Sequence, residues 1–114
     1  MIVTDASFEE VIKDNSLVLI DFWAEWCGPC RAFGPVYEKL SEKYPEITFA
    51  KVDTDAEQEI SAAAGISSIP TLMIFRDGIL LFSQPGALPG PALDDLISQV
   101  TALDMDQVRK EVSE

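Results

Sequence analysis

The chain has 114 residues, 47% of them hydrophobic, which is enough for a single domain with an ordinary core. Eight basic and 20 acidic residues give a net charge of −12, which argues against binding to a nucleic-acid backbone. No apolar run approaches the ~18 residues of a membrane span, so we expect no membrane association. The acidity favours solubility, with electrostatic steering of a partner as the alternative.

The sequence contains two cysteines and no histidine, and this narrows its possible chemistry. Without histidine, Ser–His and Cys–His catalysis and most zinc sites are ruled out. A small secreted domain would usually carry more cysteines, and residues 1–5 show no signal-peptide pattern. We therefore expect a cytoplasmic protein, in which a cysteine pair more often does chemistry than stabilises the fold.

The first half of the chain predicts two helices around a buried strand. Ser7-Phe8-Glu9-Glu10 is typical of a capping box and predicts a helix from near Ser7 to about Lys13. Residues 17–23 are apolar on both faces, as in a central strand. Pro29 suits the first position of a helix that runs to about Tyr44 and that Pro35 should kink.

The second half predicts further strands and helices. These are a strand over 47–53, a helix over 57–64 that Gly65 ends, strands over 71–76 and 79–83, a loop over 84–91 and a helix over 92–101. Asp77-Gly78 between two apolar runs is the strongest short-range signal for a hairpin. The segment 102–114 is expected as a C-terminal extension, either a new short helix or a frayed end of the preceding one.

The order of these elements, βαβαβαββα with one strand ahead of the first helix, predicts an α/β domain over residues 1–101. Alternating strands and helices imply parallel pairing, and the hairpin adds an antiparallel pair. We expect a central mixed sheet of about five strands flanked by about four helices. Small flavodoxin-like domains share the alternation, but the hairpin argues against them.

The candidate site is Cys27-Gly28-Pro29-Cys30, which follows a buried strand and opens a helix. This spacing puts both thiols in the first helical turn, where the positive end of the helix favours a thiolate. Cys30 lies deeper in the helix and should be the more buried thiol. Half of a shared zinc or iron–sulfur site and a structural disulfide are the alternatives to a redox role.

The stretch Val18–Arg31, with Trp26 directly before Cys27, closely resembles the active-site stretch of the thioredoxin family. The resemblance extends in order from about Thr4 to Val100, through Pro35, Ala50–Asp53, Gly65-Ile66, Ile69-Pro70-Thr71, Asp77-Gly78 and Gly86–Leu88. It implies the thioredoxin fold and a general protein-disulfide reductant. Cys27 would attack a substrate disulfide and Cys30 would resolve the mixed disulfide.

The resemblance also implies partners and cofactors. No cofactor would be bound, and the Cys27–Cys30 disulfide would be reduced by thioredoxin reductase, an NADPH-dependent flavoprotein. The other partners would be protein disulfides, and we expect a monomer. A binding subunit that does not turn over is the alternative, and an oxidase or isomerase of an oxidising compartment is a third reading.

The resemblance assigns roles to further residues. Asp21 would be buried and would take the proton of the resolving thiol, and Lys51 would tune it; a surface carboxylate and a surface lysine are the alternatives. Gly28 and Pro29 would set the redox poise. The substrate would lie against Trp26, Ile69, a cis Pro70, Gly86 and Ala87.

Some residues depart from the common family pattern, among them Pro89 and Pro91, which are less usual there. Arg31 follows the second cysteine where lysine is frequent, and both residues keep a positive charge. Ser68 stands where many relatives have glycine, and its side chain would crowd or hydrogen-bond a substrate. Pro85 lacks an N–H donor and should stiffen a loop that faces the substrate, which would narrow the choice of partner.

Overall fold

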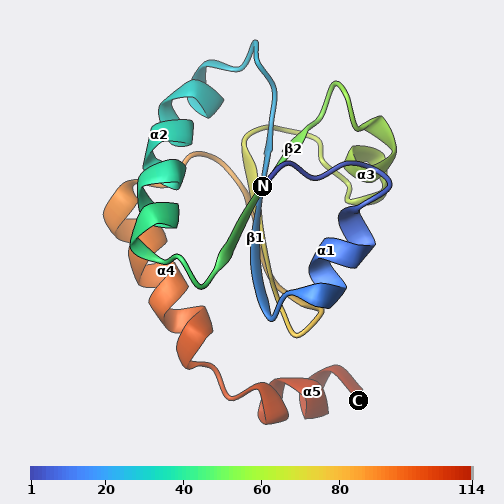
Figure 1. The fold of residues 1–114 in the computed structure, drawn as a ribbon, viewed down its shortest axis with the longest axis vertical. Coiled ribbons are helices and arrows are strands. Elements are labelled where there is room, and N and C mark those ends of the chain that lie inside the picture. Colours follow the sequence, from blue (N-terminus) through green and yellow to red (C-terminus); the bar gives the residue numbers. More distant parts are fainter. Residues whose placement is uncertain (114) are drawn as a thin grey trace.

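A four-stranded mixed sheet forms the centre of the computed structural model, which describes residues 1–113 (Figure 1). The strands are β1 (Leu17–Trp23), β2 (Thr48–Asp53), β3 (Thr71–Arg76) and β4 (Ile79–Pro85), in the spatial order β2-β1-β3-β4. β1 pairs in parallel with β2 and antiparallel with β3, and β3 pairs antiparallel with β4. The predicted α/β architecture with a mixed sheet is confirmed.

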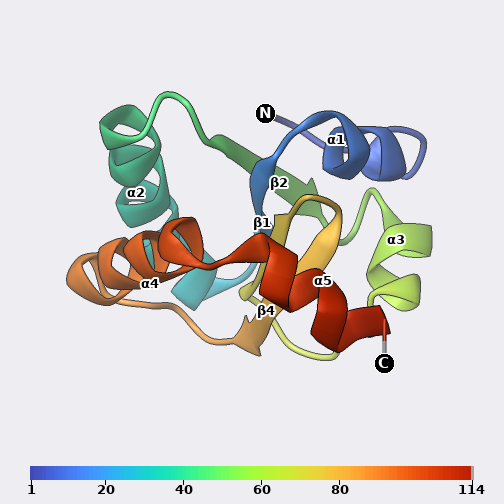
Figure 2. The same cartoon turned by 90° about the horizontal axis from the view of Figure 1, so that it is seen from below.

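Helices cover both faces of this sheet (Figures 1 and 2). They are α1 (Phe8–Asp14), α2 (Gly28–Lys43), α3 (Gln58–Ala63), α4 (Gly90–Ala102) and α5 (Met105–Ser113). α1 and α3 lie on one face and α2 and α4 on the other, while α5 lies at the end of the sheet near the β3–β4 turn (Figure 2). In residues 1–113, none of the helices has the length and apolar character needed to cross a membrane.

The predicted count of about five strands and about four helices is wrong by one in each case. The strand expected ahead of α1 is reduced to a single parallel bridge between Ile2 and Lys51. The N–H of Val3 donates to the Lys51 carbonyl at 2.9 Å, and the Lys51 N–H donates to the Met1 carbonyl at 2.9 Å. Because the chain turns at Thr4 toward α1, the pairing with β2 does not continue beyond this bridge.

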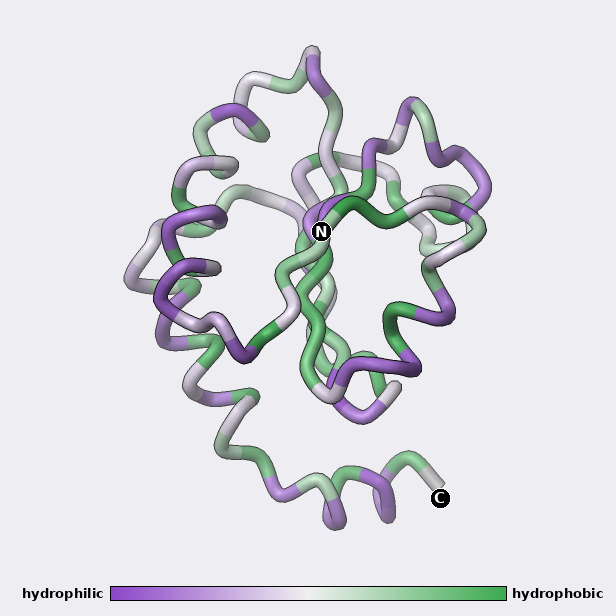
Figure 3. The backbone as a smooth tube through the Cα atoms, in the orientation of Figure 1, coloured by the Kyte–Doolittle hydropathy of each residue, from purple (hydrophilic) through white to green (hydrophobic). Residues whose placement is uncertain are grey.

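The alternation of side chains along β1 divides the interior into two cores. Leu19 faces α2 and α4, where it packs with Phe33 and Leu93 among others. Ile20 and Phe22 belong to the other core, under α1 and α3. Figure 3 shows the hydrophobic residues concentrated along the central strands, as expected of a sheet buried on both faces.

Several predicted boundaries need correction. Ser7 precedes α1, but its side chain makes no capping bond to the helix and instead accepts the Thr4 N–H at 2.9 Å, so the predicted capping box is absent. β4 continues through Pro85, where a loop was predicted; this is tolerated because β4 is an edge strand. α4 begins at Gly90 rather than at residue 92, with proline in its first turn. α2 continues as one helix on both sides of Pro35.

The two predicted turn signals are confirmed by backbone angles. Asp77 and Gly78 have φ of 52° and 80°, the left-handed pair that a two-residue hairpin turn requires. Gly65, with φ of 69°, follows α3 and ends it. The sequence therefore located both places where the chain needs a left-handed residue to reverse or stop.

The C-terminal segment folds back against the hairpin end of the sheet. Nη1 of Arg76 donates to the carbonyl oxygens of Val100, Thr101 and Leu103 at 2.7, 3.0 and 3.0 Å. The following helix, α5, buries Met105 but leaves Val112 64% exposed. The division into a domain over 1–101 and an extension over 102–114 stays a prediction.

Candidate active site at Cys27 and Cys30

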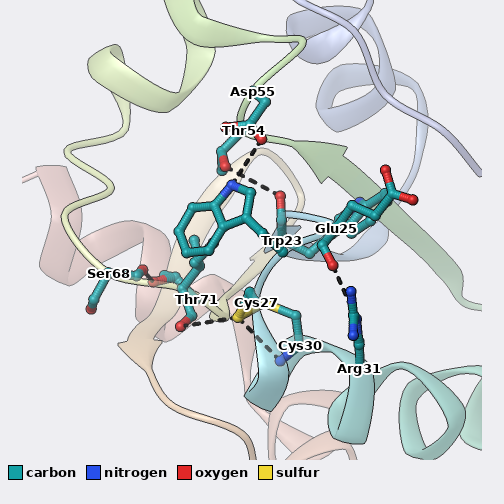
Figure 4. Close-up of a disulfide and its surroundings, with 11 residues drawn as sticks. Trp23, Glu25, Cys27, Cys30, Arg31, Thr54, Asp55, Ser68 and Thr71 are labelled. Carbon is teal, nitrogen blue, oxygen red and sulfur yellow. Dashed lines mark hydrogen bonds between the residues drawn. A yellow bond between two sulfur atoms is a disulfide. The ribbon is translucent and has the colours of Figure 1, made fainter.

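Cys27 and Cys30 form a disulfide at the N-terminus of α2, with their Cα atoms 5.2 Å apart (Figure 4). Cys27 is the N-cap residue, and its Sγ accepts the N–H of Cys30 at 3.2 Å. Gly28 and Pro29 form the first helical turn between them. Because the free N–H groups of a helix N-terminus stabilise negative charge, this position favours a thiolate at Cys27 when the disulfide is reduced.

The two cysteines are equally buried but line different cavities. Cys27 is 4% and Cys30 is 5% exposed, so the prediction that Cys30 is the more buried residue is wrong. In the oxidised pair, the short bridge holds both sulfurs against Ala24, Trp23 and Ile69. Cys27 lines a groove of about 430 Å³. Cys30 lines a separate pocket of about 180 Å³ that contains Lys51.

Trp26 forms one wall of the groove beside Cys27. Its side chain is 68% exposed, and its indole N–H donates to Oδ2 of Asp55 at 2.9 Å. The opposite wall carries Ile69, whose carbonyl oxygen lies 3.7 Å from the sulfur of Cys27. Trp26 is therefore exposed and borders the groove, and the backbone of Ile69 lies beside Cys27. That these residues bind a substrate stays a prediction.

The Ile69–Pro70 peptide bond is cis, and Pro70 is buried. The Gly86 N–H donates to the carbonyl oxygen of Pro70 at 2.7 Å, which joins the end of β4 to the site. Gly86 has φ of 107°, a conformation that side chains rarely adopt. Ala87 is exposed in the segment before α4 and does not line the groove.

The groove has lining residues that sequence reasoning did not assign. They are Thr54, Ile66 and Ser67, together with Ser68, which was singled out only as a departure from the family pattern. Thr54 could have been found from topology, because the carboxyl ends of the parallel strands β1 and β2 meet at one edge of the sheet. Its N–H donates to the Trp23 carbonyl at 2.9 Å.

Asp21 is a buried carboxyl group beneath the N-terminal part of α2. It is 1% exposed, and within residues 1–113 neither of its oxygens has a hydrogen-bond partner. Burial raises its pKa from 3.8 to about 6, and the positive charge of Lys51 opposes part of that rise. A carboxyl group with this pKa can both hold and release a proton near neutral pH.

Lys51 is the partner of Asp21 in the parallel register of β1 and β2, so the two side chains are on the same face of the sheet. Its ammonium lies 4.9 Å from the centre of the Trp23 ring, in a cation–π contact. Lys51 also lines the pocket that contains Cys30. Lys51 is thus a neighbour both of Asp21, across the sheet, and of Cys30, in a pocket apart from the groove.

A mixed sheet between helical layers, with a Cys-x-x-Cys pair at disulfide distance on a helix N-terminus, defines a thiol–disulfide oxidoreductase. Of the described residues, no cluster of three or more His, Cys, Asp or Glu side chains could hold a metal ion. The family model described as thioredoxin matches residues 1–102. The chain belongs to the thioredoxin family.

Individual relatives agree with this assignment. The Streptomyces coelicolor protein named "Putative thioredoxin 2" is 59% identical over 112 residues, which are 98% of this chain and 84% of that protein. The solved structure of a thioredoxin variant from Halobacterium salinarum has a TM-score of 0.83 at 38% identity and covers 91% of this chain and 92% of its own. A Plasmodium falciparum thioredoxin structure gives 0.79 at 40% identity, covering 86% and 96%.

Proposed function

We propose that this oxidoreductase is a general reductant of protein disulfides that works as a monomer in the cytoplasm. The observation that carries the proposal is the position of Cys27, at a helix N-cap and in an open groove. The helix end favours its thiolate, and the groove gives a protein disulfide access to it. A redox pair without further cysteines fits a reducing compartment, where a dithiol persists between turnovers.

The reaction proceeds in two exchanges. The Cys27 thiolate attacks one sulfur of the substrate disulfide, which forms a mixed disulfide and releases the other sulfur as a thiolate that takes up a proton. Cys30 then loses its proton to Asp21, whose pKa Lys51 adjusts, and attacks the Cys27 sulfur. The second substrate thiol leaves, and the Cys27–Cys30 disulfide remains. Gly28 and Pro29, between the cysteines, set the redox poise.

The substrate binds in an extended conformation along the groove. The backbone of Ile69 next to Cys27 offers strand-like hydrogen bonds, and Trp26 borders the same groove. Pro70, Gly86 and Ala87 lie outside the groove lining and would meet the part of the substrate that extends beyond it. Side chains of the substrate meet the hydroxyl groups of Ser67 and Ser68, which line the groove and are exposed. Among residues 1–113 none of those that line the groove is charged, so binding depends mainly on the substrate backbone and its apolar side chains.

An external reductase completes the cycle. A dithiol carrier holds two electrons and must receive them again after each turnover; the donor we propose is an NADPH-dependent flavoprotein, thioredoxin reductase. The carrier itself binds no cofactor in this scheme. Electrons then pass from NADPH through the flavoprotein to Cys27–Cys30 and on to the substrate.

The first test is the reduction potential of the Cys27–Cys30 couple, measured in glutathione buffers with thiol trapping. We expect a value below the cytosolic glutathione poise of about −220 to −260 mV. A value well above it would indicate an oxidant or isomerase and would overturn the proposal. Insulin reduction is the companion assay: we expect the wild type to reduce insulin and Cys27→Ser to lose this activity, whereas a binding subunit that does not turn over would reduce insulin in neither form.

A further inference from the structure

Two pockets meet on the side of α2 that faces β2. The smaller, of about 180 Å³, reaches Cys30, and the larger, of about 360 Å³, reaches Tyr37. Gly34 and Lys51 line both pockets, so these two residues form the junction between them. At about 30 Å³ per water molecule, the smaller pocket has room for several waters beside Cys30.

These pockets are separate from the substrate groove. The groove is lined by Cys27 but not by Cys30, Gly34 or Lys51. A protein substrate linked to Cys27 covers this groove for as long as the mixed disulfide lasts. Cys30 must lose its proton during that time, so the proton needs a route that the substrate does not block.

Neither the backbone conformation nor the packing around residue 34 requires a glycine there. Gly34 lies inside α2, where glycine destabilises a helix by about 1 kcal/mol relative to alanine. Its φ is outside the left-handed region, and a Cβ atom built on it would meet nothing within 4 Å. The fold would therefore accept a side chain here, and that side chain would extend into the junction of the two pockets.

We propose that these pockets are the proton outlet of Cys30 and Asp21 and that the missing side chain of Gly34 keeps the outlet open. The inference rests on the reductase function proposed above and adds a route to it. Cys30 gives up its proton to the Asp21 carboxylate, from which it passes to the pocket water beside the Lys51 ammonium. The Cys27–Cys30 bond then forms, the bond from Cys27 to the substrate sulfur breaks, and the substrate thiolate takes a proton from water on its own side.

Charged and titratable groups surround this route on every element that borders it. They are Asp21 on β1, Lys51 on β2, Arg31, Tyr37 and Glu38 on α2, Glu25 in the preceding loop and the amino group of Met1. Tyr37 donates its hydroxyl hydrogen to the Ala50 carbonyl at 2.8 Å, and Nε of Arg31 donates to the Glu25 carbonyl at 3.0 Å. Lys51 is thus the cation at the junction, next to Asp21 in the sheet.

The test compares Gly34→Met, which fills the junction, with Gly34→Ala, which adds one methyl group and serves as the matched control. Reduced protein is mixed with insulin, quenched in acid at successive times, and the insulin–Cys27 mixed disulfide is quantified by mass spectrometry between pH 5 and pH 9. Gly34→Leu provides a second plug of different shape if Gly34→Met does not fold. The reduction potential and the rate at which Cys27 is alkylated are measured on each variant.

For Gly34→Met we expect the mixed disulfide to decay about tenfold or more slowly at neutral pH, with an altered pH profile. Alkylation of Cys27 and the reduction potential should stay within twofold and a few millivolts of the wild type, and Gly34→Ala should behave like the wild type. Decay at the wild-type rate in both plugged variants would overturn the proposal, as would equal slowing in Gly34→Ala. Failure of the reductase function itself would appear separately, as a high potential in the wild-type protein.

Discussion

Asp21 is the residue whose surroundings are least favourable to its charge. It is ionised in the unfolded chain above its ordinary pKa of 3.8, but burial keeps it protonated in the folded protein up to a pKa of about 6. Between these values the folded state binds more protons than the unfolded state, so stability falls as the pH rises from about 4 to about 6. Above pH 6 the destabilisation is complete and constant.

We therefore expect Asp21→Asn to stabilise the protein at pH 7 by about 3 kcal/mol, because asparagine imitates the protonated acid and the shift spans about two pKa units. At pH 4 the variant and the wild type should be equally stable. Denaturant unfolding at pH 4, 5, 6 and 7 checks this. Asp14→Asn, at an exposed position of α1, is the control and should change nothing; a gain for Asp21→Asn at pH 4 as large as at pH 7 would contradict the explanation.

A second residue-scale prediction concerns the Trp26 wall of the groove. Asp55→Ala removes the acceptor of the indole N–H, and an exposed hydrogen bond is worth about 0.5–1.5 kcal/mol. We expect KM for a protein disulfide to rise about two- to tenfold with little change in kcat, since the cysteines are untouched. Steady-state insulin reduction with saturating reductase measures both constants. A fall in kcat at unchanged KM would place Asp55 in the chemistry instead.

At the scale of elements, one arginine of β3 connects the sheet to the segment where α4 ends and α5 follows. Arg76 satisfies three carbonyl groups at the C-terminal end of α4, where a helix leaves its last carbonyls without partners. Arg109 of α5 pairs with Asp77 and Asp106 at the surface, with its side chain 49% exposed. In the first set the bond to Val100 is partly buried and the bonds to Thr101 and Leu103 are exposed, whereas both pairs of Arg109 are open to solvent.

These contacts predict different effects for two matched variants. Arg76→Met should destabilise the protein by about 1.5–3 kcal/mol, because hydrogen bonds to a charged group are strong and the carbonyls lose their partner. Arg109→Met should change stability much less than Arg76→Met, as is usual for exposed ion pairs. Denaturant unfolding compares them, and neither variant should alter insulin reduction. Equal losses of stability in the two variants would contradict this prediction, because they would show that the two arginines contribute alike.

The elements also show which sequence signals were sufficient. β1, β3 and the hairpin turn were located from apolar runs and the Asp-Gly pair, because these signals act within a few residues. The ends of β4 and α4 were misplaced because prolines suggested a loop. An edge strand and a first helical turn both tolerate proline, and whether a strand lies at an edge is decided by the rest of the sheet.

For the whole molecule, the main electrostatic feature is its excess of negative charge. At a net charge of −12, the negatively charged side chains repel one another more strongly in the compact folded state than in the expanded unfolded state. The redox site and α5 lie at opposite ends of the molecule: α2 begins at one end, where it carries the two cysteines, and α5 lies at the other (Figure 1). Changes in α5 should therefore affect stability without reaching the redox site.

Screening of this charge leads to a prediction for the whole chain. Raising NaCl from about 10 mM to about 150 mM shortens the Debye length from about 30 Å to about 8 Å and weakens the repulsion. We expect Tm at pH 7 to rise by several degrees. Near the isoelectric point of about 4.1 the same salt change should have little effect. Thermal unfolding at both pH values tests this prediction. An equal rise in Tm at pH 7 and near pH 4.1 would contradict it, because it would indicate a salt effect that does not depend on the net charge.

The sequence alone determined the order of the elements from α1 to α4, the cysteine pair at the start of a helix and the turn at Asp77-Gly78, because each depends on neighbouring residues. The family resemblance added Asp21, Lys51 and Pro70 as partners of the site. Only the tertiary structure decided that both cysteines are equally buried, that Cys30 and Lys51 share a pocket apart from the groove, and that Gly34 lies at its junction. Those facts depend on how α2 packs across β1 and β2, and packing between distant segments leaves no local signal in the chain.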